Sequence, residues 1–377
     1  MVLESDFGPH SSGGAESQVR TLSVRLKSLG HRVTILTPLF SWGPQKIVGR
    51  CFGLPVGRIS YPRVPVMGGA VAALRLAMFL LGRGRRYDAW HVHIAHNFGA
   101  VSCLIGSLIG KPVVVKISGS WELEQGLMAP RRGLFSRIAA SCLKRASVVQ
   151  AISTRIARDL PRHGFPVERI LVLPNAVDTK RFRVRQAQRV PGAPFTVLFV
   201  GRLVEEKGLP TLLNAWADAF GARTDVRLRL VGGGELEAPL RAQTEQLGIA
   251  GQVEFVGHRN VIEDEIGNAD VATLPSRFEG LANTLLEYMA SGLPTLASRV
   301  SGSEDFIVTG RNGWLFPPSD VAALSACLRE ARELPADKLR ALGVTARADV
   351  EAAAGVERVV DRLLGVYRGG LPGVGNR

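Results

Sequence analysis

The chain has 377 residues, of which 46% are hydrophobic and 6% aromatic, and its formal net charge is +14. One continuous core of this size would be unusual, so we expect two domains of an ordinary α/β type. The four cysteines lie far apart and form no CxxC pair, which excludes a cysteine-based metal site and favours reduced thiols in a cytoplasmic protein.

The charge is distributed unevenly along the chain. Residues 1–185 contain 27 Lys and Arg against 9 Asp and Glu, whereas residues 186–377 contain 20 against 24. Such an imbalance usually marks a basic surface that faces an anionic partner. Basic and apolar residues are interleaved in 131–145, and no basic stripe has the aromatic spacing that stacks bases. We therefore expect an anionic membrane surface and no nucleic acid, with a merely solvated basic face as the alternative.

Neither a signal peptide nor a membrane span is expected. Met1 is followed directly by an acidic segment without a basic region. The most apolar run, 66–81, contains Arg75 and is shorter than the roughly 20 residues that span a bilayer. It is interpreted as a buried or interfacial helix, and the protein as cytoplasmic and peripheral at the inner face of the cytoplasmic membrane.

The first half of the chain alternates short apolar strands with helices. This alternation predicts a parallel, doubly wound sheet. Only Met1–Leu3 is available as a first strand of this sheet. The further expected elements are a helix at 14–29, strands at 31–38, 88–93, 112–118 and 146–153, a helix at 154–163, and a strand at 168–177.

A polar, basic, proline-containing segment at 183–194 interrupts the alternation and predicts an interdomain linker. The predicted domains are therefore 1–185 and 186–377, with the last helix, about 355–368, as a candidate to cross back to the first domain. Ligands of such sheets bind at the carboxyl ends of the strands. The second half is expected to hold strands at 195–201, 226–232, 252–257, 270–276 and 293–298.

Two carboxylates stand eight positions apart in the segment FEGLANTLLEYMASG at 278–292. Glu279 lies in a glycine-containing turn, and Glu287 lies within an apolar helix predicted to start near Leu281. The amino end of a helix is a natural anion site. We therefore expect the turn formed by Gly280, Leu281, Ala282 and Asn283 to bind an anion beside Glu279.

A second anion-binding signal is the segment GRLVEEKG at 201–208, which carries Arg202 and Lys207 in a strand-to-helix loop. Cations at this place can neutralise a phosphate that leaves in a transition state. No two aspartates are separated by one residue, so we predict that these cations and a helix end replace a metal, and we expect no metal or other cofactor. The alternative is a surface loop in which Glu205 and Glu206 pair with the cations.

Three histidines, His91, His93 and His96, lie at the end of the predicted strand 88–93. Alternation places His91 and His93 on one face of the strand. No further ligand cluster accompanies them, which disfavours zinc. We favour His93 as a functional residue because it is nearest the strand end, with a core histidine as the alternative.

Together these segments resemble the retaining glycosyltransferases of family 4, which have the two-domain GT-B fold. The Glu-x7-Glu signature is matched by Glu279 and Glu287. The Gly-Arg-x5-Lys-Gly element is matched by Arg202 and Lys207 with its spacing shortened to Arg-x4-Lys. The resemblance extends over nearly the whole chain, through GGAESQV at 13–19, LPNAVDTKRF at 173–182 and ADVATLPSRFEG at 269–280.

The resemblance implies roles for individual residues. Arg202 and Lys207 would contact the diphosphate of the donor, Glu279 would position the transferred sugar, and Glu287 would accept hydrogen bonds from the ribose hydroxyls. His93 would lie close to the acceptor hydroxyl.

The resemblance also extends to loops. The pair Gly13 and Gly14 matches the glycine loop that meets donor and acceptor, and the segment with His258 and Arg259 matches the region whose backbone holds the base. Two loops depart from the family pattern: Gly233 stands where Asp is usual, and 116–120 replaces a Thr-x-His-Gly segment.

The resemblance thus implies a retaining transferase that moves a sugar from a nucleotide-sugar donor to a hydroxyl of a saccharide or lipid-linked saccharide, in bacterial cell-surface polysaccharide or glycolipid synthesis. One rival is a non-catalytic scaffold that binds sugar nucleotides. A Rossmann-type NAD enzyme is disfavoured because the GxGxxG fingerprint is missing. A phosphorylase-like enzyme is disfavoured because no pyridoxal lysine context is recognisable.

Overall fold

The computed structural model describes residues 1–8, 13–39, 46–64, 67–129, 133–184 and 192–370. The chain divides into two compact units. Unit 1 comprises Met1–Ala176 with Val356–Arg377, and unit 2 comprises Val177–Gly355. Each unit is an α/β domain built on a parallel sheet, as the alternating pattern predicts.

In unit 1 the strands form one sheet around the first residues of the chain. Val2 bridges Leu36 on one side and Val92 on the other, both in parallel. Met1–Leu3 therefore lies inside the sheet, because its backbone groups pair with strands on both sides. The sheet orders are β1-β3-β2 and β4-β5-β6-β7, with β2 antiparallel to β3.

The strands of unit 1 are short, and helices connect them. Its strands are β1 (Ile35–Pro38), β2 (Val48–Cys51), β3 (Leu54–Ile59), β4 (Trp90–Val92), β5 (Val113–Ile117), β6 (Val148–Ala151) and β7 (Ile170–Val172). Its helices are α1 (Gly14–Ser28), α2 (Met67–Leu81), η1 (Arg83–Arg86), α3 (Asn97–Ile109), α4 (Ser120–Glu124), α5 (Leu134–Leu143), α6 (Thr154–Asp159), η2 (Leu160–His163), η3 (Val167–Arg169) and α14 (Val356–Tyr367).

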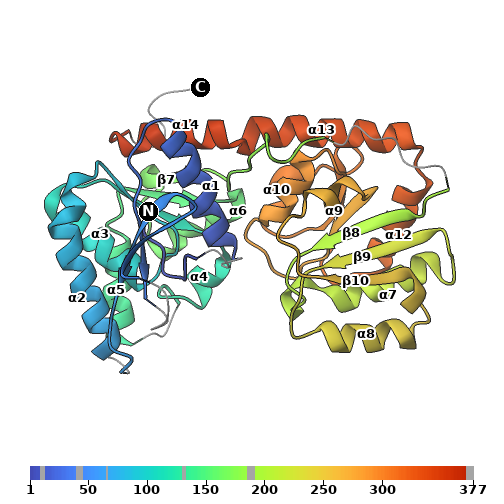
Figure 1. Ribbon diagram of the computed structural model, residues 1–377, viewed down its shortest axis with the longest axis horizontal. Coiled ribbons are helices and arrows are strands. Elements are labelled where there is room, and N and C mark those ends of the chain that lie inside the picture. The colour runs from blue at the N-terminus through green and yellow to red at the C-terminus, as the bar shows by residue number, and fades with distance from the viewer. Residues whose placement is uncertain (9–12, 40–45, 65–66, 130–132, 185–191, 371–377) are drawn as a thin grey trace. The chain divides into compact units, whose positions relative to one another are not determined.

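The last helix, α14, packs in unit 1 beside α1 (Figure 1). Its buried residues Val356, Val359, Val360 and Leu363 follow the helical period and join a core cluster with Leu22 of α1. The chain returns to unit 1 at this helix, and its bounds lie close to those expected for the final helix.

Unit 2 has a six-stranded parallel sheet in the order β10-β9-β8-β11-β12-β13. The order reverses between β8 and β11, which makes this the switch point of the sheet. β8 is buried along its whole length, as its continuous apolar sequence predicts. The elements are β8 (Phe195–Val200), η4 (Glu205–Lys207), α7 (Leu209–Phe220), β9 (Val226–Val231), α8 (Glu237–Gln246), η5 (Ala250–Gln252), β10 (Val253–Gly257), α9 (Glu263–Gly267), β11 (Val271–Leu274), α10 (Asn283–Ala290), β12 (Thr295–Ser298), α11 (Ser303–Phe306), β13 (Gly313–Phe316), α12 (Val321–Glu333) and α13 (Ala336–Ala354).

The division between the units falls at Ala176 and Val177, before the predicted boundary at 185/186. Contacts of Arg347 in α13 explain why the boundary lies before residue 177. Its guanidinium donates hydrogen bonds to the carbonyls of Thr179 and Phe182, at 2.9 and 2.6 Å, which fastens this segment to unit 2. Part of the predicted linker, 185–191, lies outside the described residues.

In the part of the chain that the structure describes, no helix is long and apolar enough to cross a membrane. The run predicted as a buried or interfacial helix is α2, which buries one face and exposes the other. All four cysteines are free; Cys51 and Cys103 are buried, and Cys142 and Cys327 are partly exposed.

Candidate active site

The two motifs singled out in the second half of the sequence meet at the switch point of unit 2. The Arg202–Lys207 loop follows β8, and the loop that carries Glu279 follows β11, which is the neighbour of β8. The amide of Arg277 donates to the carbonyl of Glu206 at 2.8 Å, and this bond joins the loops directly. Residues more than seventy positions apart are thus brought together where α/β sheets bind ligands.

Lys207 forms an ion pair with Glu279 across these loops. Both side chains are about four-fifths buried, with 18% and 20% of their area exposed. The Ser276 hydroxyl also donates to Glu279, at 3.4 Å. The pair holds a cation and a carboxylate at fixed positions at the carboxyl end of the sheet.

Arg202 lies exposed in the same loop, and its guanidinium forms no ion pair within the described residues. The alternative that Glu205 and Glu206 neutralise the two cations is not what the structure has. Glu205 pairs with Arg277 instead, and Lys207 pairs with Glu279. Arg202 therefore remains available to an anionic ligand. Sequence reasoning missed Arg277, although its place in the matched segment before Glu279 was a usable signal.

A glycine makes the close approach of the loops possible. Gly208 has φ +65°, and a Cβ built on it would lie 2.2 Å from the carbonyl oxygen of Pro275. An L-residue there would be strained by its φ angle and by the contact with the second loop. Gly232, which follows β9, likewise allows close contact with the residue before Arg202. A Cβ on Gly232 would lie 1.9 Å from the carbonyl oxygen of Gly201.

The turn predicted to bind an anion leads into α10. α10 starts at Asn283, two residues after the predicted start at Leu281. The residue before it, Ala282, has no polar side chain with which to cap the helix. Gly280 and Leu281 are buried and lead from Glu279 into this helix end. The positive end of α10 thus lies just after Glu279 in the chain, as the sequence predicts.

Glu287 lies further along α10 and is half-buried. Burial raises the pKa of its carboxyl to about 7, while the nearby Arg181 lowers this pKa and Glu263 raises it. The side chain accepts no hydrogen bond from the described residues. Arg181 instead directs its Nε to Glu263, at 2.5 Å. Glu287 is thus a desolvated carboxylate whose oxygens can accept hydrogen bonds from a ligand. Arg181, missed by sequence reasoning, belongs to the matched segment 173–182.

His258 and Arg259 follow β10 and are exposed. Arg259 places its Nε 3.5 Å from Glu265, which also pairs with Arg229. The carbonyl of Gly257, the last residue of β10, accepts a hydrogen bond from the amide of Gly232 at 2.9 Å. The loops after β9 and β10 are therefore joined, at the same edge of the sheet as Arg202.

The other predicted residues, Gly13, Gly14 and His93, belong to unit 1. Gly13 is the cap of α1, and both glycines are exposed. His93 has no exposed surface and stacks on His91 with ring centroids 4.2 Å apart. Burial lowers the pKa of both imidazoles well below the usual value. The preference for His93 is therefore corrected: it is the core histidine that the sequence left as the alternative.

His96 is the histidine that reaches the surface, with 43% of its side chain exposed. Its Nδ1 lies 2.8 Å from Oε1 of Glu4, and the other carboxylate oxygen of Glu4 accepts a hydrogen bond from the amide of Phe98 at 2.6 Å. Glu4 follows the central strand and so reaches the loop after β4. Sequence reasoning missed it because no local pattern shows that Met1–Leu3 pairs beside β4.

A second missed carboxylate, Glu122, holds the same loop from inside. It accepts hydrogen bonds from the amides of Ala95 at 3.2 Å and Ser118 at 2.9 Å, and it is buried. Burial raises the pKa of Glu122 and lowers that of the neighbouring Lys116. Two carboxylates thus fix the backbone around His96. No sequence signal distinguished Glu122 from an ordinary helical glutamate.

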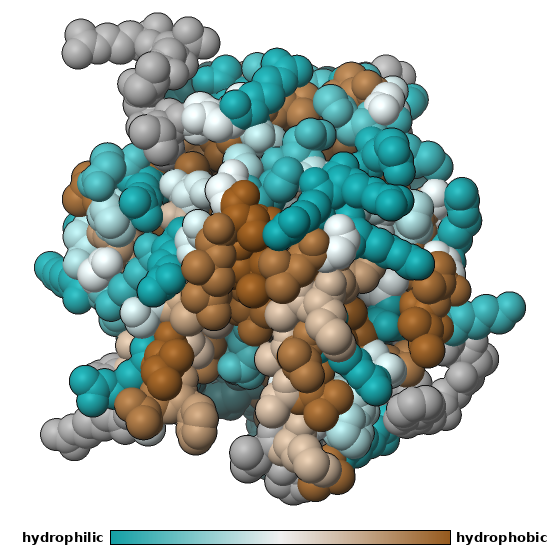
Figure 2. Space-filling model, turned by 90° about the vertical axis from the view of Figure 1, so that its left-hand side faces the viewer, coloured by the Kyte–Doolittle hydropathy of each residue, from teal (hydrophilic) through white to brown (hydrophobic). Residues whose placement is uncertain are grey.

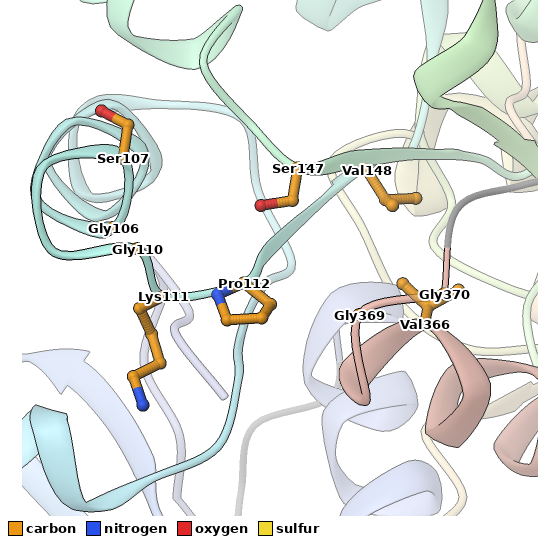
Figure 3. A pocket seen from close by; sticks show the side chains of 10 residues that line it. All are labelled: Gly106, Ser107, Gly110, Lys111, Pro112, Ser147, Val148, Val366, Gly369 and Gly370. Atoms are coloured by element: carbon orange, nitrogen blue, oxygen red, sulfur yellow. The ribbon is translucent and has the colours of Figure 1, made fainter.

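The cavity of about 290 Å³ in unit 1 lies elsewhere (Figure 3). Lys111, Pro112, Ser147 and Val148 line it, and these residues lie at the amino ends of β5 and β6. Ligands of such sheets bind at the opposite ends, so this cavity is not part of the site. Among the described residues, no group of His, Cys, Asp and Glu side chains is arranged to hold a metal ion.

Comparison with known proteins shows the family of the chain. The family model "Glycosyl transferase 4-like domain" matches residues 13–176, and "Glycosyl transferases group 1" matches residues 180–349. The putative colanic acid biosynthesis glycosyltransferase WcaL of Salmonella typhimurium is 32% identical over 215 residues, 55% of this chain and 53% of the relative. The chain thus spans about half the length of this relative. The 2-deoxystreptamine N-acetyl-D-glucosaminyltransferase of Streptomyces fradiae is 28% identical over 94% of this chain and 90% of its own.

Solved structures share the fold. HepE of Anabaena in complex with UDP matches with a TM-score of 0.76 and 20% identity, over 96% of this chain and 97% of that one. Sucrose-phosphate synthase from Thermosynechococcus elongatus matches with a TM-score of 0.78 and 21% identity, over 98% of each chain. The two family models together match most of the chain, and the chain therefore belongs to the glycosyltransferases with the GT-B fold, with a 4-like domain followed by a group 1 domain.

Proposed function

We propose that this protein is a retaining glycosyltransferase that takes a sugar from a nucleotide-sugar donor and passes it to a hydroxyl of a saccharide or lipid-linked saccharide. The observation that carries the proposal is the grouping at the switch point of unit 2, where exposed Arg202, the Lys207–Glu279 pair and the start of α10 come together. HepE was solved with UDP and with UDP-glucose, and WcaL is named for colanic acid biosynthesis, which is consistent with this class of donor and product.

The chemistry follows from the charges. Breaking the bond between the anomeric carbon and the diphosphate builds negative charge on the leaving oxygen, and fixed cations at that place lower the barrier. Arg202 and Lys207 supply this charge, together with the amide groups at the start of α10. Lys207 already pairs with a carboxylate, so its position is set before the donor arrives.

Retention follows if the acceptor attacks from the face that the diphosphate leaves. The acceptor oxygen forms the new bond to the anomeric carbon, the bond to the phosphate oxygen breaks, and that oxygen takes the acceptor proton. No separate general base is needed for this step. Glu279 positions the sugar and stabilises positive charge at the reacting carbon.

Glu287 would hold the ribose of the donor. A desolvated carboxylate without hydrogen-bond donors of its own gains most from two hydroxyl groups. On the acceptor side we assign to His96 the part first given to His93, because His96 is exposed and is fixed through Glu4. The mechanism uses no metal ion, and the basic unit 1 would meet the acceptor at an anionic membrane surface.

A panel of nucleotide sugars tests the proposal. Release of UDP, GDP or ADP with formation of an α-linked product from an α-linked donor is expected. Donor binding without release would instead indicate a non-catalytic sugar-nucleotide-binding protein. An inverted product would contradict retention while leaving the transferase class intact.

A further inference from the structure

Helix α5 turns its apolar residues outward. Leu134, Phe135 and Ile138 have 67%, 84% and 53% of their area exposed, and of its ten residues Leu143 alone is buried. A surface helix of a soluble domain normally turns its apolar stripe to the core. The orientation of α5 therefore indicates a partner outside the unit.

The neighbouring helices α3 and α2 also expose apolar residues. α3 contacts both α5 and α2, so the three helices lie side by side. α2 exposes Met67, Leu74 and Met78, and α3 exposes Leu108. Figure 2 faces this side of unit 1 and shows hydrophobic residues gathered over it. None of the three helices contains Asp or Glu, so these exposed apolar residues lie on helices without acidic side chains.

A basic cavity of about 230 Å³ adjoins α5. Arg137 of α5 and Lys144, the residue that follows this helix, line it seven positions apart, and His163 and Met128 line it from other segments. No acidic side chain lines the cavity, and neither Arg137 nor Lys144 forms an ion pair with any residue that the structure describes. Two cationic side chains and a histidine around one cavity are groups that can bind a phosphate.

We propose that this surface, called the α5 face and made of Leu134, Phe135 and Ile138 with Arg137 and Lys144, docks on an anionic lipid bilayer. The apolar residues enter the headgroup region, and the two cations bind a lipid phosphate. Helices with basic and apolar residues bind membranes in this way. A second copy of the chain is a poorer occupant, because a symmetric contact would bring Arg137 and Lys144 of both copies together.

The inference rests on the proposed function only for the biological role of docking, which is to bring the enzyme to a lipid-linked acceptor.

The test uses flotation of the full chain with vesicles of phosphatidylcholine alone or mixed with phosphatidylglycerol, at physiological ionic strength. The wild type is expected to bind the mixed vesicles and to bind phosphatidylcholine weakly.

Two variants divide the face. Arg137→Ala with Lys144→Ala is expected to weaken binding about 30-fold, because each basic residue near an anionic surface contributes about fivefold. Phe135→Ser with Ile138→Ser is expected to weaken binding about tenfold through lost apolar burial. The matched controls are Arg340→Ala and Val344→Ser on α13, both exposed residues of unit 2. They should bind like the wild type.

Three results would overturn the inference. One is binding that is indifferent to phosphatidylglycerol or equal in all variants. Another is displacement from vesicles by millimolar inorganic phosphate, which would make the cavity a site for free anions. The third is a concentration-dependent dimer that the Phe135→Ser and Ile138→Ser changes abolish. Nucleoside diphosphate release in vesicle-free solution should be equal in all variants, and its absence in the wild type would count against the proposed function alone.

Discussion

The loops at the carboxyl ends of the strands differ in chemistry between the two units. In unit 2 they present an exposed Arg202 and a mostly buried Lys207–Glu279 pair, and α10, which follows one of them, carries Glu287, whose carboxylate accepts no hydrogen bond from the residues that the structure describes. In unit 1 the segment after β4 is instead fixed by hydrogen bonds from its amides to Glu4 and Glu122, and of the histidines at 91, 93 and 96 only His96 reaches the surface. The loops of unit 2 thus present charged side chains to a ligand, whereas two carboxylates of unit 1 fix the backbone of the segment after β4.

The largest effect is expected where unit 2 meets the leaving phosphate. Arg202→Ala and Lys207→Ala should each raise the barrier to transfer by about 2.7–4 kcal/mol, or 10²–10³ in kcat, because the charge they neutralise develops in the transition state. Turnover of the donor measures this effect. Arg241→Ala, an exposed arginine on α8, is the control, and near-normal turnover of both test variants would contradict the assignment.

The histidines of unit 1 should separate into a structural and a functional residue. His93→Ala removes a fully buried ring and should lower the free energy of unfolding by roughly 2–4 kcal/mol. His96→Ala should leave thermal unfolding nearly unchanged and lower transfer to the acceptor by about tenfold, which corresponds to one charged hydrogen bond. Exposed His31 provides a control. The reverse pattern would restore the original preference for His93.

Glu287 should govern donor affinity in a pH-dependent way. Its pKa is raised to about 7, and ribose hydroxyls donate to the ionised form, so affinity should rise as the pH rises from 6 to 8. Both phosphates of a nucleotide sugar are esterified and do not titrate in this range. Glu287→Gln should weaken binding by about 10- to 100-fold at pH 8 and flatten the profile. Calorimetry with UDP-glucose as the probe measures both, and an unchanged profile in the variant would remove Glu287 from the ribose site.

The same carboxyl should have a smaller effect on stability. The folded form keeps its proton up to about pH 7, while the unfolded carboxyl loses it near 4.5, so stability should fall as the pH rises through this window. Glu287→Gln should remove a pH dependence of about 2 kcal/mol between pH 5 and pH 7.5. Urea unfolding at pH 5 and pH 7.5 measures the difference. Equal slopes in both proteins would mean that burial does not raise this pKa.

The sequence predicts the parts of the molecule that depend on local pattern. β8 is a continuous apolar strand, and the start of α10 after a glycine turn was found to within two residues. The proximity of the Arg202–Lys207 loop and Glu279 was predictable because these residues lie in short motifs at strand ends. The central position of Met1–Leu3, the burial of His93 and the reach of Glu4 and Glu122 depend on which strands pair, and no local pattern specifies this.

The most direct test of the account is a crystal structure of the protein with bound UDP-glucose. The account predicts the diphosphate within hydrogen-bonding distance of Arg202, Lys207 and the first amides of α10, with the ribose hydroxyls on Glu287. A ligand bound elsewhere, or a divalent ion bridging the two phosphates, would contradict it.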